Sequence, residues 1–144
     1  MSFEIGAVGA LEVLDSRGRP TLQVTVSLTD ETTATAGVPS GASTGTREAV
    51  ELRDGDTDRF GGAGVLGAVG AVNGELADLL CGRAWPSLAE VDGAMIAADG
   101  TPNKGRLGAN ATVGVSMALA RALARSARQP LHAWLPGFGQ RPRL

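Results

Sequence analysis

The chain has 144 residues, a formal net charge of −2 and one cysteine, Cys81. This length suits one domain with a substantial core. A single cysteine excludes an intramolecular disulfide, and the first residues predict no signal peptide, so we expect a cytoplasmic protein. No basic run and no apolar segment of about 20 residues occurs, so we expect neither nucleic acid nor a membrane as a partner.

The first part of the chain predicts β-structure. Residues 5–14 are apolar and β-capable, and a turn separates them from residues 21–29. Apolar and hydroxyl side chains alternate strictly over residues 21–29, as in a strand with one buried face. Residues 32–38 predict a third strand. The short connections predict an antiparallel three-stranded meander.

A loop rich in glycine and hydroxyl side chains follows, over residues 38–48. Gly41 and Gly45 permit backbone conformations that other residues avoid. The loop places several hydroxyls beside main-chain groups, those of Ser40, Ser43, Thr44 and Thr46. Such a loop can bind a hard cation or a phosphate.

The same loop has other interpretations. Residues 41–45 fit the G-x-S-x-G nucleophile elbow, which would make Ser43 the nucleophile of a serine hydrolase with His132 and an acid such as Asp92. That elbow belongs above a parallel sheet, whereas this chain predicts an antiparallel one. The hydrolase is therefore a remote alternative, beside that of a plain Ser/Gly-rich turn.

The segment after the loop predicts one or two helical turns over residues 48–52 and then a polar turn over residues 53–58. We expect Asp54 and Asp56 to cap that turn. Residues 62–67 match G-x-G-x-x-G literally, but no buried strand precedes them, as a dinucleotide site requires. We expect no nucleotide there.

The second half of the chain predicts helices. Apolar residues recur at steps of three and four over residues 65–80, and Ser87 with Glu90 forms the pattern of a capping box. Further helices are predicted over residues 109–127 and 130–135. We expect residues 136–144 to be a disordered tail. The fold class is α+β, a three-stranded antiparallel meander followed by a small helical bundle.

Several blocks follow one another in the order and spacing of one family. They are Leu14-Asp-Ser-Arg-Gly18, Val38-Pro-Ser-Gly-Ala-Ser-Thr-Gly45, Glu51-Leu-Arg-Asp-Gly-Asp56, Asp99-Gly-Thr101, Leu107-Gly-Ala-Asn-Ala111 and Gly114-Val-Ser116. Together they resemble the enolases. The resemblance runs to about Leu135 and corresponds to the enolase N-terminal domain, so we expect residues 1–135 to form one domain of that kind.

The resemblance implies a lyase of glycolysis, which dehydrates 2-phosphoglycerate to phosphoenolpyruvate with two Mg²⁺ ions. It implies that the hydroxyl and carbonyl of Ser40 ligate the second Mg²⁺. The neighbouring residues would form a lid over the substrate, namely Gly41, Ala42, Ser43, Thr44 and Gly45. We expect no catalytic residue from this chain alone.

The catalytic barrel of the family has no counterpart in this sequence. Such a barrel takes roughly 250 residues, so we expect a truncated enolase-like protein that is inactive, and binds Mg²⁺ only with a barrel-bearing partner. Lys104, the only lysine, matches a structural segment of the family and is expected to be non-catalytic. His132 stands where the family usually has tyrosine and is expected to be a surface or packing residue.

Two charges that enolases commonly use for dimerisation are also missing. The matching positions hold Leu11 and Gln23. Apolar side chains that a barrel would cover would face water here. We therefore expect the partner to be either a barrel-bearing enolase chain or a second copy, and we keep a non-catalytic, self-associating interaction module as the alternative function.

Overall fold

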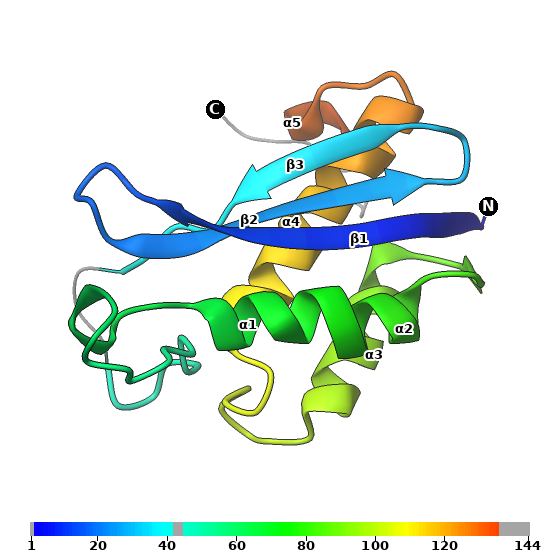
Figure 1. Ribbon diagram of the computed structural model, residues 1–144. Coiled ribbons are helices and arrows are strands. Elements are labelled where there is room, and N and C mark those ends of the chain that lie inside the picture. The colour runs from blue at the N-terminus through cyan, green and yellow to red at the C-terminus, as the bar shows by residue number, and fades with distance from the viewer. Residues whose placement is uncertain (1, 42–44, 136–144) are drawn as a thin grey trace.

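The fold is an α+β arrangement, as the sequence predicts, in which one antiparallel sheet carries helices on its inner face (Figure 1). The computed structural model describes residues 2–41 and 45–135. The predicted tail, residues 136–144, and three residues of the loop, 42–44, lie outside the described residues. The strands are β1 (Phe3–Leu14), β2 (Pro20–Leu28), β3 (Thr33–Gly37) and β4 (Ala84–Trp85), in the order β3-β2-β1-β4.

The helical elements follow the third strand and then surround β4. They are η1 (Phe60–Gly62), α1 (Leu66–Ala71), η2 (Val72–Leu76), α2 (Ala77–Leu80), α3 (Leu88–Asp99), α4 (Ala109–Ser126) and α5 (Leu131–Trp134). η1 is a 3₁₀ turn and η2 is a π-helical turn. None of the helices in the described part of the chain has the length and apolarity that a membrane crossing requires.

The predicted three-stranded antiparallel meander is present as β1, β2 and β3, and the sheet also has a fourth strand, β4, that the sequence analysis did not predict. β4 pairs with the start of β1, where Trp85 lies opposite Phe3, and the Trp85 indole N–H donates to the Leu80 carbonyl at 2.9 Å. A strand of two residues is too short to show a period-two pattern, so the sequence gives no signal for it.

β2 confirms the predicted alternation. Its apolar side chains are buried, namely Leu22, Val24, Val26 and Leu28. Thr21 is the exception on the hydroxyl face, because it is buried and its Oγ1 donates to the Val38 carbonyl at 2.7 Å. The inner face of the sheet therefore supplies the core, and Thr21 fastens the end of β3 to the start of β2.

The predicted helix over residues 65–80 is confirmed as a continuous run of α1, η2 and α2 that lies along the free edge of β1 (Figure 1). Asn73, in the π-helical turn, binds the main chain of Ala10 on that edge. Its Oδ1 accepts from Ala10 N at 2.7 Å, and its Nδ2 donates to Ala10 O at 3.2 Å. The side-chain amide takes the place of a strand residue, which protects an otherwise unpaired edge.

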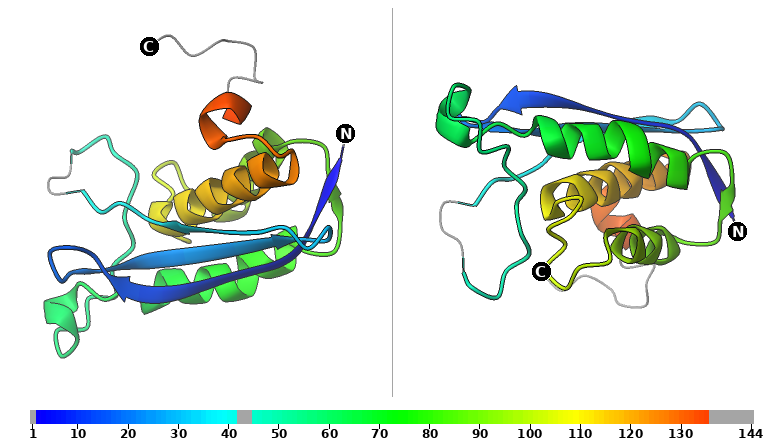
Figure 2. Two further views of the ribbon diagram at one scale, coloured as in Figure 1. Left: turned by 90° about the horizontal axis from the view of Figure 1, so that it is seen from above. Right: turned by 60° about the horizontal axis from the view of Figure 1, so that its bottom comes forward.

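The two long helices form the layer beneath the sheet. α4 packs on β2 and β3, and α3 packs on α4, so the strands lie along one side of the molecule with the helices beneath them (Figure 2, right). The Ser87 hydroxyl accepts from Glu90 N at 3.2 Å and caps α3, as predicted. No described helix covers the outer face of the sheet.

The helical turns predicted over residues 48–52 are absent. This segment instead pairs with residues 103–110: Val50 N donates to Asn103 O, Ala109 N donates to Val50 O, and the Asn110 amide bonds both the N–H and the carbonyl of Leu52. These partners are distant in sequence and take the main-chain groups that a local helix would have used. The local propensity was overridden by tertiary hydrogen bonds.

Candidate functional site

The candidate site lies in the loop after β3, at the opposite end of the sheet from the N-terminus (Figure 1). Val38 anchors its start, because its N–H donates to Leu22 O at 2.8 Å. Of the predicted lid residues, Gly41 and Gly45 are described and exposed. Ala42, Ser43 and Thr44 lie outside the described residues. Ser40 is therefore the central side chain of the described part of the loop.

Both oxygens of Ser40 accept hydrogen bonds from arginines. Arg53 Nη2 donates to the hydroxyl Oγ at 2.9 Å, and Arg17 Nη2 donates to the carbonyl oxygen at 3.2 Å. Arg17 comes from the turn between β1 and β2, and Arg53 comes from the segment that replaces the predicted helical turns. Ser40 is thus held by two cations from separate parts of the chain.

Arg17 is held in turn by Asp15. Its Nη2 forms an ion pair with Asp15 Oδ2 at 3.0 Å. The other carboxylate oxygen of Asp15 accepts the main-chain N–H groups of Arg17 and Arg19, at 2.8 and 3.0 Å. Chiefly because of the Arg19 N–H, the pKa of Asp15 lies below its ordinary value. Asp15 is therefore ionised at neutral pH and fixes the guanidinium beside Ser40.

Arg53 has a larger set of partners. Besides Ser40, its guanidinium donates to the carbonyls of Pro20 and Ala63, at 2.5 and 2.7 Å, and to Glu51 Oε1 at 3.0 Å. These contacts join the start of β2, the turn before α1 and the candidate loop. Sequence reasoning missed Arg53, because carbonyl acceptors far away in the chain leave no pattern around the arginine.

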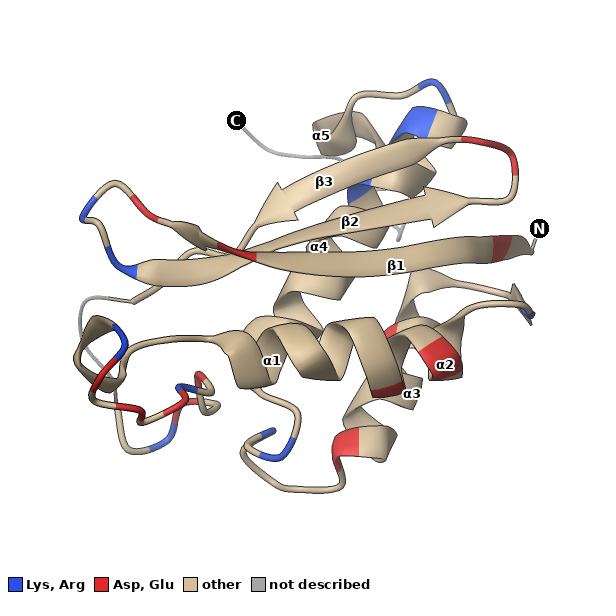
Figure 3. Cartoon of the chain, viewed as in Figure 1, with Lys and Arg blue, Asp and Glu red and all other residues tan. Residues whose placement is uncertain are grey.

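A second polar cluster fixes the start of α1 near this site. Glu12 Oε1 pairs with Arg59 Nη2 at 2.5 Å, and Glu12 Oε2 accepts from Val65 N at 2.8 Å. The hydrogen bond from Arg59 is the main cause of the lowered pKa of Glu12. The charged loops that carry both clusters gather at the left of Figure 3, whereas β2 and β3 carry no charged residue.

Asp56 caps the predicted turn, because its Oδ1 accepts from Asp58 N at 3.0 Å, but the prediction was wrong for Asp54, which binds the start of a helix instead. The Asp54 carboxylate accepts the N–H groups of Leu66 and Gly67, each at 2.8 Å, at the N-terminus of α1. A Cβ at Gly64 would lie 2.8 Å from Asp54 Oδ2, so glycine is needed for this approach. The 3₁₀ turn η1 leads into the glycine motif, where a dinucleotide-binding motif follows a buried strand.

Ser40 fits Mg²⁺ by the chemistry of its donors. A hydroxyl and a carbonyl are the hard oxygen ligands that Mg²⁺ prefers. Mg²⁺ takes six ligands, however, and among the described residues no three His, Cys, Asp or Glu side chains come together as metal ligands. In the described residues the metal site is thus incomplete, and the two oxygens that could serve it both carry arginine N–H groups.

The residues of the hydrolase alternative do not form a catalytic group in the described chain. Asp92 lies on α3 against Ser116, and burial raises its pKa. His132 is exposed on α5, and no hydrogen bond between the described residues joins it to Asp92. Ser43 lies outside the described residues. The described sheet is also antiparallel, whereas a nucleophile elbow lies above a parallel sheet.

Lys104 lies in the turn between α3 and α4, at a φ of 58°. Its N–H donates to Thr101 O at 3.3 Å, within a turn that Asp99 organises. This position suits the predicted structural role of the residue. Nothing in the described structure brings its amine to the candidate loop.

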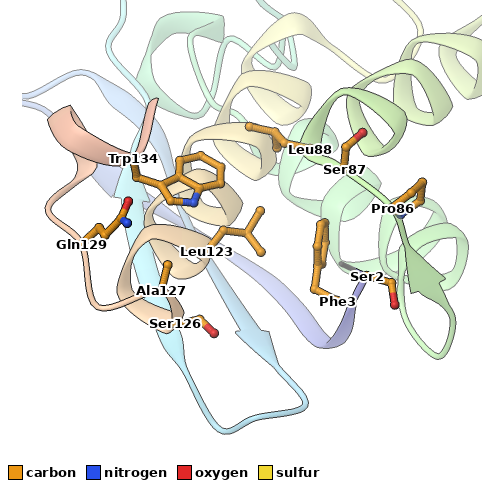
Figure 4. Close-up of a pocket in the computed structure, with 10 residues that line it drawn as sticks. All are labelled: Ser2, Phe3, Pro86, Ser87, Leu88, Leu123, Ser126, Ala127, Gln129 and Trp134. Carbon is orange, nitrogen blue, oxygen red and sulfur yellow. The ribbon is translucent and has the colours of Figure 1, made fainter. Parts of the chain in front are cut away.

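A cavity of about 550 Å³ lies at the other end of the molecule. Phe3, Leu88, Leu123 and Trp134 line it, and Figure 4 shows their side chains around one hollow between the start of β1 and the end of α4. No ionisable side chain of the described residues lines this cavity.

Comparison with known proteins gives consistent matches. A family model described as "Enolase, N-terminal domain" matches residues 5–135. The chain is 55% identical over 141 residues to "Enolase" of Desulfotalea psychrophila, which covers 98% of this chain and 33% of that protein. It is 55% identical over 140 residues to "Enolase 1" of Methylococcus capsulatus, which covers 97% of this chain and 33% of that protein. The chain thus spans about a third of the length of these curated relatives.

Proposed function

The chain belongs to the enolase N-terminal domain family, and we propose from this premise that it acts as the capping domain of a phosphopyruvate hydratase. In that role it contributes Ser40 to a magnesium site whose other ligands, and whose acid and base, come from a barrel domain. The barrel is supplied either by further residues of the same protein or by a separate chain. The reaction is the dehydration of 2-phosphoglycerate in glycolysis, in the cytosol.

The observation that carries this proposal is the arrangement around Ser40. Its hydroxyl and carbonyl are fixed at the edge of the domain by Arg53 and Arg17, and Ser40 is half-buried rather than free. Ser40 thus has two hard oxygens, and each keeps a second lone pair beside the arginine N–H group that it accepts. Mg²⁺ bound there would stabilise negative charge that develops on substrate oxygens.

We propose that this chain positions Ser40 and covers the substrate, and that it does not transfer a proton. The described site contains two arginines, and each forms an ion pair with a carboxylate, Arg17 with Asp15 and Arg53 with Glu51. Removal of a proton from the carbon next to a carboxylate requires a general base with a suitably tuned pKa. We therefore propose that the chain without a barrel is inactive.

The test is reconstitution with the remaining two thirds of an enolase relative, fused after residue 135. We expect the chimera to form phosphoenolpyruvate from 2-phosphoglycerate in a magnesium-dependent way. Ser40→Ala is expected to lower kcat/KM by at least about tenfold, because it removes a ligand that acts on developing charge. Formation of phosphoenolpyruvate is followed by its ultraviolet absorbance.

The matched control is Thr57→Ala, which removes an exposed hydroxyl outside the site. It is expected to leave kcat/KM unchanged, and circular dichroism should show that both variants fold. Equal activity of Ser40→Ala and the parent chimera would contradict the role of Ser40.

A second candidate function, the self-associating module, is favoured by the outer face of the sheet. Leu11 is 66% exposed there and lies directly opposite Gln23 in the register of β1 and β2. Hydroxyl pairs form the rest of this face, between Thr25 and Thr35 and between Ser27 and Thr33. The face is uncharged, and burial of the exposed Leu11 side chain against a second copy would favour association.

Association on this face predicts that the mass measured by light scattering rises with the concentration of the chain. Leu11→Ser should shift the mass toward the monomer, because it replaces the most exposed apolar side chain of the face. Leu66→Ser is the control, since Leu66 is also exposed but lies on α1. A monomer at every concentration would refute this second function.

A further inference from the structure

The hydrogen bonds that hold Ser40 conflict with the role proposed for it. The oxygens proposed to bind Mg²⁺ are the two that accept from Arg53 and Arg17. Resting on the proposed function, we propose that these arginines compete with the divalent cation for Ser40. They act as positioning residues that occupy Ser40 without the metal and must release it when the metal binds.

The competition follows from charge and from lone pairs. A guanidinium is always protonated, so each arginine places a positive charge within hydrogen-bond distance of an oxygen that would bind a second cation. Like charges repel strongly at such distances in a partly buried site. Each oxygen has two lone pairs, and one of them already accepts an N–H group, so a metal could use only the other, beside the guanidinium. The arrangement in the structure and a metal-bound Ser40 therefore oppose each other.

Both arginines keep other partners when they release Ser40. Arg17 retains its ion pair with Asp15, and Arg53 retains Glu51 and the two carbonyls of Pro20 and Ala63. Neither guanidinium would be left buried and unpaired, so release has a low cost. The same partners keep the charges close to Ser40, and the competition therefore persists.

The two arginines should differ in how strongly they compete with the cation for Ser40. The Arg53 side chain is 19% exposed, whereas the Arg17 side chain is 40% exposed. Solvent screens the more exposed charge better. The Arg53 contact goes to the hydroxyl at 2.9 Å and is also the shorter of the two. Arg53 is therefore the stronger competitor.

The test measures metal affinity directly in the chimera with a barrel, with Mn²⁺ as the probe. Mn²⁺ is titrated in the presence of 2-phosphoglycerate, and free Mn²⁺ is followed by electron paramagnetic resonance. Arg17→Gln is expected to lower the Kd of the weaker Mn²⁺ site by about threefold, and Arg53→Gln by about tenfold. If the arginines only held Ser40 in place, both substitutions would raise the Kd, because a disordered Ser40 would bind the ion less well.

Two controls separate charge from position. Arg17→Lys keeps the positive charge and should leave the Kd near that of the parent. Arg19→Gln makes the same change of net charge in the same turn, but no hydrogen bond joins the Arg19 side chain to Ser40 in the described structure, so the Kd should not change. Arg17→Gln leaves the carbonyl contacts of Arg53 intact, so it provides the test even if Arg53→Gln does not fold.

The outcomes distinguish this inference from the proposed function. If Ser40→Ala abolishes the weaker Mn²⁺ site and Arg17→Gln tightens it, both stand. If Ser40→Ala abolishes the site but Arg17→Gln weakens it or leaves it unchanged, the competition is wrong and the function of Ser40 stands. If Ser40→Ala leaves both Mn²⁺ sites unchanged, the proposed function fails.

Discussion

Replacement of Asp99 by alanine is expected to lower the free energy of unfolding by about 3–5 kcal/mol. Asp99 ends α3 and is only 2% exposed. Its carboxylate accepts from Leu107 N at 2.8 Å, from Thr101 N at 3.0 Å and from the Thr101 hydroxyl. Alanine would leave the buried Leu107 N–H without an acceptor. Chemical denaturation of the chain measures the loss.

The pH dependence of stability gives a second measure of how much the Asp99 carboxylate stabilises the fold. Burial alone would raise its pKa, but the hydrogen bonds from Thr101 and Leu107 hold it below the ordinary value of 3.8. A carboxyl with a lowered pKa in the folded state contributes stability above its unfolded pKa, and this is lost as the pH falls through the folded value. Asp99→Asn should therefore flatten the decline of stability below about pH 4.

Asp58→Ala is the control for Asp99, because Asp58 is exposed and its side chain accepts no hydrogen bond in the described structure. Its effect should lie within about 0.5 kcal/mol. If Asp99→Ala were as mild as Asp58→Ala, the turn that contains Lys104 would not depend on this carboxylate.

Replacement of Gly114 by alanine is expected to lower the free energy of unfolding by about 2–3 kcal/mol. Gly114 lies on α4 where the helix crosses the sheet. A Cβ at this position would lie 2.6 Å from Val24 Cγ2 and 2.9 Å from Val38 Cγ2. Both valines are buried, so α4 would have to move away from the sheet. Thermal denaturation would show the loss as a lower Tm.

Gly93→Ala supplies the matched control in α3, where a Cβ would meet nothing within 4 Å. The same substitution should raise stability there, by about 0.5–1 kcal/mol, because alanine favours the helix more than glycine does. We therefore expect the free energy of unfolding to fall for Gly114→Ala and to rise for Gly93→Ala. If it changed in the same direction in both variants, close packing would not explain why Gly114 is glycine.

The sequence predicted the parts of the fold that rest on local pattern. The alternation in β2, the helical spacing over residues 65–80 and the Ser87 cap all appear in the structure. Each depends on residues close together in the chain. The prediction failed for residues 48–52 and for β4, where a partner distant in sequence decides the conformation.

The same difference between local motifs and distant contacts applies to the candidate site. Ser40 was predicted from its motif, whereas Arg17 and Arg53 were not connected with it. The guanidinium of Arg53 binds carbonyls of Pro20 and Ala63, and every residue of the chain carries a carbonyl. A generic acceptor leaves no mark in the sequence that would identify it as a partner.

By itself, the sequence determined the family and the α+β class, and it predicted a role for Ser40 in the loop. Hydrophobic period and motif spacing are local and are written directly into the order of residues. Only the tertiary structure decided that two arginines hold Ser40 and that Asn73 closes the edge of β1. Those contacts depend on how distant segments meet, and they form because a polar group in a folded chain must find a hydrogen-bond partner.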